Sequence, residues 1–161
     1  SIMPYLCKKL NKTPDELLDI YNHESGMKGV SGISNDSRDI ENALFNKDGK
    51  ATKEQMERAA LTCELYTRIV SKYIGEYYVE LGGCDAIAFT AGVGEHAAYL
   101  RKMIIDKCSK AFNVFLDDQL NDAHGNSEGL ISSSSSKIAC YVIPTNEEVV
   151  IARDTVRLLE L

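Results

Sequence analysis

The sequence lacks the features that mark several common classes of protein. It has no apolar run of about 18 residues or more, so no membrane-spanning helix is predicted, and its first residues do not form a signal peptide. Positive charge is not in excess. The formal net charge is −6, which gives no electrostatic reason to bind nucleic acid or anionic lipid. We therefore predict neither a nucleic-acid partner nor a membrane partner.

The cysteines lack the pattern of a redox or zinc motif. Their number, five, is odd, and no two of them form a C-x-x-C pair. Most have apolar neighbours, where a free thiol behaves as a small hydrophobic group. A reducing, cytoplasmic setting fits this usage best. The cysteines are Cys7, Cys63, Cys84, Cys108 and Cys140.

Motifs for several catalytic classes are also missing. There is no G-x-x-x-x-G-K-[ST] phosphate loop and no arguable Ser-His-Asp arrangement. The G-x-G pair at Gly92 and Gly94 does not extend to the dinucleotide-binding fingerprint, because position 97 is Ala97. The histidines have no metal-ligand spacing. Only His96, beside the glycine pair, is placed to touch a ligand, and His124 is interpreted as loop surface.

What is present is typical of a globular chain. The 161 residues are 44% hydrophobic and 26% charged, and a chain of this size buries about two thirds of its unfolded surface. Residues 1–6 already follow an apolar pattern and do not begin with Met. We interpret the sequence as one domain, or part of one, from a longer chain. A processed tag or linker scar is the alternative.

Capping boxes predict the starts of three helices. Thr13–Glu16 opens a helix that ends near Gly26, and Thr52–Gln55 opens the longest one, which Gly82-Gly83 ends. Thr145–Glu148 opens the last helix. That helix is expected to turn four apolar side chains inward, namely Val149, Ala152, Val156 and Leu159.

Short apolar segments between the helices predict strands. Ala86–Thr90 and Lys137–Ile143 have strand length and composition, and Phe112–Leu116 is a third candidate. Gly29–Ser34 is predicted as a loop or short strand, and Ala91–Gly94 as a tight loop followed by a helix. Because helices alternate with short strands, the predicted fold class is α/β, with helices packed on a sheet.

The strand–loop–helix unit around Gly92 is the first candidate site. Its glycines remove Cβ atoms, so a flat ligand can lie against bare backbone. The helix that follows adds unpaired N–H groups and a positive dipole end. Part of a nucleotide would fit such a place. An ordinary strand-to-helix turn is the alternative.

Two other polar segments could carry chemistry. Arg38, within Ser34–Asp39, could pair with a phosphate or stack on a base, although a helix cap at Asp36 beside a solvated Arg is the simpler interpretation. In Pro144–Glu148, Glu147 could hold magnesium. Carboxylates in a first helical turn also suit the helix dipole without any function.

Taken in order, these segments resemble the acetate kinase family, and they match its C-terminal portion. Several matching blocks in the family's order and separation are far more specific than one block alone. The resemblance covers essentially the whole chain. The blocks are Gly29–Asp39, Asp85–Glu95 and Val142–Glu148 with Ile151–Asp154, preceded by Met3–Leu6 and Thr13–Glu16.

The resemblance implies that residues 1–161 are a partial nucleotide-binding domain of a longer kinase. Acetate kinases transfer the γ-phosphoryl group of ATP to acetate, reversibly and with magnesium. Their fold is of the sugar-kinase and actin type, with two related ribonuclease H-like α/β domains, and they are homodimers. We therefore expect ATP or ADP, Mg²⁺ and acetate as ligands, and a second copy of the chain as partner.

By the same resemblance, the expected site residues fall into three groups. Asp36, Ser37 and Arg38 line the adenosine site; Gly92, Val93, Gly94, Glu95 and His96 form a loop against the adenine and ribose; Glu147 is the magnesium-associated glutamate. Gly92–Gly94 and Arg38 together are expected to form a cradle for adenosine. Relatives often have a bulky apolar residue in place of Ser37 and commonly Asn in place of His96, and both changes bear on base preference.

The family's acetate pocket, catalytic Asp, transition-state-stabilising groups and phosphate loops lie upstream of the matched region. Phosphoryl transfer depends on positioning and on neutralising charge around the moving phosphate. We therefore predict no catalytic residue in this chain, weak nucleotide binding and no turnover by the chain alone. Two alternatives stay open: a propionate kinase, which shares these blocks, and a stand-alone nucleotide-binding or interaction module.

Overall fold

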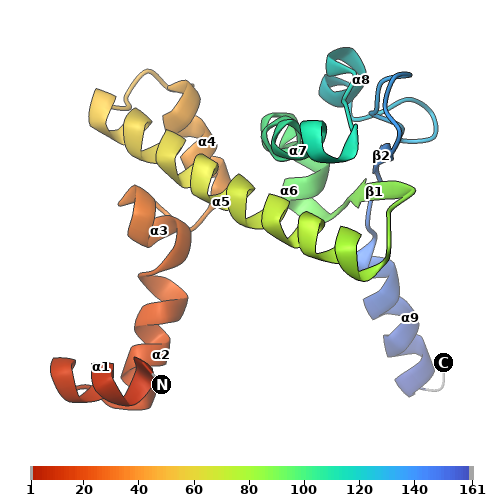
Figure 1. Cartoon of the computed structure of the whole chain (residues 1–161). Coiled ribbons are helices and arrows are strands. Elements are labelled where there is room, and N and C mark those ends of the chain that lie inside the picture. Colours follow the sequence, from red (N-terminus) through yellow and green to blue (C-terminus); the bar gives the residue numbers. More distant parts are fainter. Residues whose placement is uncertain (1, 160–161) are drawn as a thin grey trace. The chain divides into compact units, whose positions relative to one another are not determined.

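The chain consists of two compact units, Ser1–Ile69 and Val70–Leu161, and each is considered by itself. The computed structural model in Figure 1 describes residues 2–159, apart from the side chain of Glu147. Within that part of the chain, no helix combines the length and the apolar composition that crossing a membrane requires.

The first unit is helical. It contains α1 (Ile2–Leu10), α2 (Pro14–His23), α3 (Gly26–Ser31), α4 (Ser37–Phe45) and the N-terminal part of α5 (Lys53–Glu80). Its core is a set of buried apolar side chains from α2, α4 and α5. They are Leu17, Ile40, Ala43, Ala59 and Cys63.

The first two predicted capping boxes are confirmed. The Thr13 hydroxyl accepts from the Glu16 N–H at 3.2 Å, and the Glu16 carboxylate accepts from the Thr13 N–H at 2.7 Å. Thr52 and Gln55 form the same reciprocal pair at 3.2 and 2.9 Å. Each box satisfies two N–H groups that have no partner within the helix.

The segment Gly29–Ser34 differs from the prediction. Residues up to Ser31 complete α3, and Gly32 ends that helix with a left-handed φ of 67°. The side chain of Ser31 is buried, and its hydroxyl accepts from the Ile33 N–H at 3.0 Å. Tertiary burial therefore overrides the weak helix propensity of this glycine-containing stretch.

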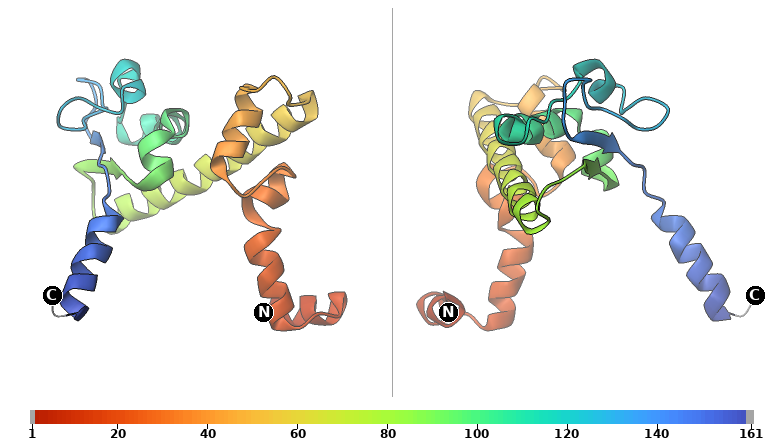
Figure 2. Two further views of the ribbon diagram at one scale, coloured as in Figure 1. Left: turned by 180° about the vertical axis from the view of Figure 1, so that it is seen from behind. Right: turned by 45° about the vertical axis from the view of Figure 1, so that its right-hand side comes forward.

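The second unit is organised around a two-stranded parallel sheet. β1 (Ala86–Phe89) and β2 (Ala139–Val142) lie side by side, with Phe89 opposite Val142 (Figures 1 and 2). Both strands fall within predicted segments and are confirmed. Their inner faces belong to one apolar cluster, made of Phe89, Ile104, Ile105, Cys108, Val114, Ile131, Ile138, Cys140 and Val142.

The C-terminal part of α5 packs against this cluster, and four further helices belong to the described part of the unit. α6 (Ala91–His96) follows β1 directly, and α7 (Ala98–Phe112) begins after a single intervening residue. α8 (Asp118–Asp122) comes next, and α9 (Glu147–Leu159) follows β2. Helices and parallel strands thus alternate, as the α/β prediction requires.

The third predicted strand, Phe112–Leu116, was wrong. α7 continues to Phe112, and Asn113 ends it with a left-handed φ of 54°. Beyond it, Leu116 forms only an isolated antiparallel bridge with Ser132. The apolar residues here pack into the core from a helix end and a loop, which a short apolar run cannot distinguish from a strand.

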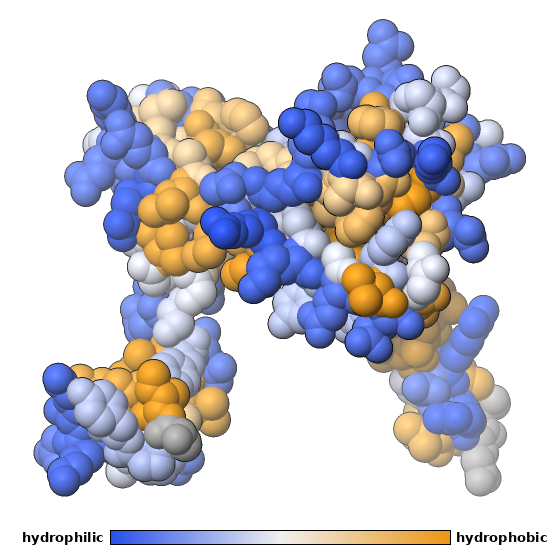
Figure 3. Space-filling view, viewed as in Figure 1, coloured by the Kyte–Doolittle hydropathy of each residue, from blue (hydrophilic) through white to orange (hydrophobic). Residues whose placement is uncertain are grey.

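The inward face expected for α9 was also wrong. Val149, Val156 and Leu159 are 36%, 49% and 61% exposed. Figure 3 accordingly shows apolar surface on this helix. Helical periodicity identifies the apolar face of a helix, but it does not identify what covers that face.

Candidate functional site

Two segments that the sequence analysis treated separately line one hollow in the second unit. Because β1 and β2 are parallel neighbours, the segments that follow them start at the same edge of the sheet. A hollow of about 500 Å³ opens between these segments. Its lining residues are Ala91, Gly92, Glu95 and His96 after β1, and Thr145, Asn146 and Glu148 after β2.

The glycine segment after β1 is a short helix, so the predicted tight loop at Ala91–Gly94 was wrong. The chain reverses at Ala91, whose φ of 59° lies in the left-handed region that favours glycine. With the reversal made there, the next residues adopt helical geometry at once. α6 therefore starts at Ala91, whereas the predicted helix starts only after Gly94.

The two glycines of α6 have different surroundings. A Cβ atom at Gly92 would meet no atom within 4 Å, whereas one at Gly94 would lie 3.2 Å from the carbonyl carbon of Phe89. The missing side chain of Gly94 thus lets α6 pack on the end of β1. The missing side chain of Gly92 leaves bare backbone facing the hollow. Val93 and Gly94 do not line the hollow.

A carboxylate joins the two lining segments. Glu95 Oε1 accepts from the Thr145 N–H and from the Thr145 hydroxyl, each at 2.9 Å. These two hydrogen bonds stabilise the charged form and hold the pKa of Glu95 below its usual value. The link fixes the start of the segment after β2 against α6.

The same link explains why the third predicted capping box was wrong. Thr145 is occupied by Glu95, and Asn146 caps α9 instead, with its Oδ1 accepting from the Val149 N–H at 3.0 Å. The cap is thus one residue later than predicted. Asn ranks somewhat above Thr as an N-cap residue, so the local preference agrees with the observed cap.

Sequence reasoning missed the side chain that supports α6 from the protein interior. Arg101, on α7, is 1% exposed, and its Nη1 donates to the carbonyls of Gly94 and Glu95 at 2.8 Å each. The available signal was a charged residue between the buried apolar residues Leu100 and Ile104. A buried Arg needs several partners, and these could not be named from the sequence.

The predicted residues of the first unit lie at the start of α4. The Asp36 carboxylate caps the helix, since its Oδ1 accepts from the Arg38 N–H at 2.9 Å. Arg38 folds back onto it, with Nε and Nη2 donating at 3.0 and 2.6 Å. This contact lowers the pKa of Asp36 to about 2. The helix-cap interpretation is confirmed, and Ser37, half-buried, is the first residue of α4.

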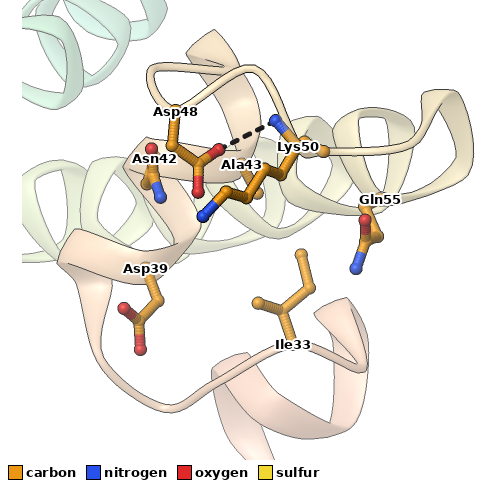
Figure 4. Close-up of a pocket in the computed structure, with 8 residues that line it drawn as sticks. Ile33, Asp39, Asn42, Ala43, Asp48, Lys50 and Gln55 are labelled. Carbon is orange, nitrogen blue, oxygen red and sulfur yellow. Dashed lines mark hydrogen bonds between the residues drawn. The ribbon is translucent and has the colours of Figure 1, made fainter.

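A second, smaller hollow of about 220 Å³ also belongs to the first unit (Figure 4). Asp48 accepts there from the Lys50 N–H at 3.0 Å, drawn as the dashed line. None of the three predicted residues of this unit lines it. Its lining is Ile33, Asp39, Asn42, Ala43, Asp48, Lys50, Ala51 and Gln55.

The predicted magnesium residue, Glu147, starts α9, but its side chain lies outside the described residues. Among the side chains that are described, no group of three or more His, Cys, Asp or Glu residues is arranged to hold a metal ion. The neighbouring carboxylate of Glu148 lines the hollow and offers the oxygen ligand that Mg²⁺ takes.

The fold and the hollow define an α/β segment whose candidate site lies at one edge of a parallel sheet. The chain belongs to the acetokinase family, whose family model matches residues 1–153. The acetate kinase of Halothermothrix orenii is 44% identical over 160 residues, which is 99% of this chain and 38% of that protein. The chain thus spans little more than a third of the length of this curated relative.

Solved structures confirm the α/β class and the resemblance. The crystal structure of Porphyromonas gingivalis acetate kinase matches 98% of this chain and 37% of its own, with 32% identity and a TM-score of 0.79. That of a propionate kinase from Francisella tularensis matches 94% of this chain and 36% of its own, with 32% identity and a TM-score of 0.76.

Proposed function

We propose that this chain supplies the nucleotide-binding portion of an acetate kinase, which reversibly transfers the γ-phosphoryl group of ATP to acetate. The observation that carries the proposal is the hollow at the ends of β1 and β2, in a chain whose curated relatives are acetate kinases. Its volume of about 500 Å³ lies within the range of about 300–1,000 Å³ that is usual for small-molecule sites.

The hollow suits the base and sugar of a nucleotide. Bare backbone at Gly92 gives a flat ligand a surface to lie on, and the imidazole of His96 can donate or accept one hydrogen bond. Val93 and Gly94 lie next to this surface without lining the hollow, and Gly94 lets α6 pack on the end of β1. Glu95 links the segment to Thr145 through a hydrogen bond. These residues form the nucleotide loop of the proposal.

Asp36, Ser37 and Arg38 are proposed to line the adenosine site from the first unit. The Arg38 side chain is 86% exposed, and its pairing with Asp36 leaves Nη1 available to a ligand. The pairing also orients the guanidinium plane, so a base could stack on it without further ordering. The cradle formed by Arg38 and the glycine segment stays a prediction.

Magnesium would be held by carboxylate oxygen, with Glu147 as the proposed residue and Glu148 beside it. When bound with the nucleotide, the ion neutralises phosphate charge. The chain's own part is to present oxygen ligands at the start of α9, which the Asn146 cap fixes in place.

The remaining elements of the proposal concern the whole kinase. We propose ATP and acetate as its small-molecule substrates, a homodimer as its assembly and the cytoplasm as its location. No catalytic residue is assigned to this chain, which is expected to bind nucleotide without turning it over. Acetyl phosphate formation by the 161-residue chain alone would contradict that assignment.

Propionate kinase is the second candidate, and the Francisella tularensis propionate kinase structure favours keeping it. The choice depends on the acyl pocket, which we place outside the matched region. Initial rates with acetate and propionate, measured side by side on a longer kinase chain containing this segment, separate the two. Faster turnover of propionate would reverse our choice.

Calorimetric titration of the chain with ADP, with and without Mg²⁺, tests the proposal directly. We expect weak binding, because the segment holds only part of the nucleotide site. No heat at millimolar ADP would contradict nucleotide binding. Tight binding would instead favour the third candidate, a stand-alone nucleotide-binding module.

A further inference from the structure

The guanidinium of Arg101 is one of the most completely bonded groups in the second unit. Its Nε donates to Asn121 Oδ1 at 2.8 Å, and its Nη2 donates to the Asn121 carbonyl at 2.6 Å and to His124 Nδ1 at 3.1 Å. Together with the two Nη1 bonds to Gly94 and Glu95, all five N–H donors are used. The geometry of one planar group thus fixes four other residues.

None of these five acceptors is a carboxylate. They are three backbone carbonyls, one side-chain amide and one imidazole nitrogen. Gly94 and Glu95 belong to the last turn of α6, where carbonyls have no helical partner and where a cation is favoured. The Asn121 carbonyl lies near the end of α8, where it also accepts from the His124 N–H at 3.1 Å. Arg101 therefore caps two short helices at once.

α6 depends on such a cap. A helix of six residues is not stable by itself, because nucleation costs more than one turn of hydrogen bonds returns. Its N-terminal residue, Ala91, adds strain from its positive φ. Besides its packing on the end of β1, the interior contact with Arg101 and the exterior contact between Glu95 and Thr145 hold its orientation.

The Asn121 amide and His124 complete the network. Asn121 Nδ2 donates to the Ala98 carbonyl at 3.0 Å, which sets the amide so that Oδ1 faces Arg101. His124 accepts through Nδ1, and its ring lies edge-on to that of His96, with 6.3 Å between centroids. One face of the network thus reaches a residue that lines the hollow.

We propose that Arg101 is the positioning residue of the nucleotide loop, with Asn121 and His124 as its supports. It touches no ligand. Its hydrogen bonds to the carbonyls of Gly94 and Glu95 fix the position of α6, and therefore the positions of Gly92 and His96. This inference rests on the proposed function for its ligand, but the support of α6 can be measured without any ligand.

The His124 position offers a matched pair of variants. Its φ of 59° favours Gly and Asn, so His124→Gly and His124→Asn are both compatible with the backbone. Asn keeps an acceptor near the position of Nδ1, whereas Gly removes it. The pair therefore isolates one hydrogen bond to Arg101, even if Arg101→Lys or Arg101→Met fails to fold.

Amide hydrogen exchange of the 161-residue chain, followed by NMR, reads the support of α6 directly. The probe is the Ala97 N–H, which donates to the Val93 carbonyl at 3.1 Å, and the control is the buried Ile105 amide of α7. We expect exchange at Ala97 to be about tenfold faster in His124→Gly than in His124→Asn, with no change at Ile105. Arg101→Lys, which cannot use five acceptors, should accelerate it about a hundredfold.

Titration with Mg-ADP on the same samples gives the second readout. We expect the chemical shifts of the α6 amides to reach half of their full change at a several-fold higher ADP concentration in His124→Gly than in His124→Asn. Equal exchange and equal ADP affinity in the two variants would overturn the role of Arg101. An unsubstituted chain whose α6 amides do not respond to ADP would contradict the proposed function instead, while the exchange rates would still decide whether Arg101 supports α6.

Discussion

Each of the two candidate segments has an arginine beside it, Arg38 at the start of α4 and Arg101 next to α6, and the two side chains differ in burial and in the sequence distance to their partners. Arg38 lies in the first unit with its side chain 86% exposed, and it pairs with Asp36, two residues earlier. Arg101 lies in the second unit, 1% exposed, and it reaches residues 6, 7, 20 and 23 positions away. The first contact is local and solvated, and the second is distant and buried.

The difference explains what each arginine can do. An exposed ion pair contributes little to stability, so Arg38 can exchange its partner for a ligand at small cost. A buried guanidinium with five acceptors is not released at small cost, because most of those acceptors would lose their donor. Arg38 is therefore suited to contact a ligand, and Arg101 is suited to hold the backbone that we propose lies against it.

Substituting each arginine by methionine is the strongest way to break this comparison. Arg101→Met should lower the free energy of unfolding by about 3 kcal/mol or more, since it removes the donor to the buried Asn121 side-chain oxygen and to the half-buried carbonyls of Gly94 and Glu95. Arg38→Met should leave the unfolding midpoint almost unchanged. Urea unfolding followed by circular dichroism measures both. Equal midpoints for the two variants would show that burial does not distinguish the two residues.

The two glycines of α6 give the next largest contrast. Gly94→Ala should destabilise the chain by about 1–3 kcal/mol, because the new methyl group would lie 3.2 Å from the Phe89 backbone. Gly92→Ala meets nothing and should gain up to about 1 kcal/mol of helix propensity. If Gly92 faces a nucleotide, however, its alanine variant should bind ADP less well despite equal or greater stability. Unchanged ADP affinity would remove Gly92 from the site.

A smaller effect is expected at Ala91, where the chain turns from β1 into α6. Its φ of 59° costs a residue with a Cβ atom about 1 kcal/mol, so Ala91→Gly should raise the free energy of unfolding by up to that amount. Thermal unfolding of Ala91→Gly is compared with that of Gly92→Ala, the matched variant. Gly92→Ala changes helix propensity without changing a residue of positive φ, so the comparison separates relief of strain from helix propensity. A destabilising Ala91→Gly would mean that the left-handed geometry is not strained.

The smallest effect concerns pH and the local pair at α4. Contact with Arg38 lowers the pKa of Asp36 from its usual 3.8 to about 2. The stabilisation from its charged form is therefore complete above pH 3.8 and is lost as the pH falls toward 2. NMR titration of the Asp36 carboxyl carbon checks the value. Asp36→Asn keeps a cap acceptor and should remove this part of the pH dependence.

Local patterns were sufficient to predict much of the fold. The capping boxes at Thr13 and Thr52, the cap at Asp36 and the two strands were all readable, because each depends on residues within a few positions of one another. The short helices α3 and α6 were not, because what stabilises them comes from elsewhere in the chain.

The candidate site was predictable in part for the same reason. The glycines of the segment after β1 identify it in the sequence. Its contact with Thr145, however, depends on the parallel pairing of β1 with β2. Glu95 and Thr145 are 50 residues apart in the sequence, so no local pattern predicts that contact. The role of Thr145 was consequently misread as a cap. Arg101 was overlooked because its five acceptor atoms belong to four residues in two other stretches of the chain, 94–95 and 121–124.

The most direct test of the account is a crystal structure of the chain with Mg-ADP. The account predicts the nucleotide in the hollow lined by Gly92, His96 and Glu148, with its base or ribose against the Gly92 backbone. ADP bound elsewhere, with that hollow closed by side chains, would contradict it.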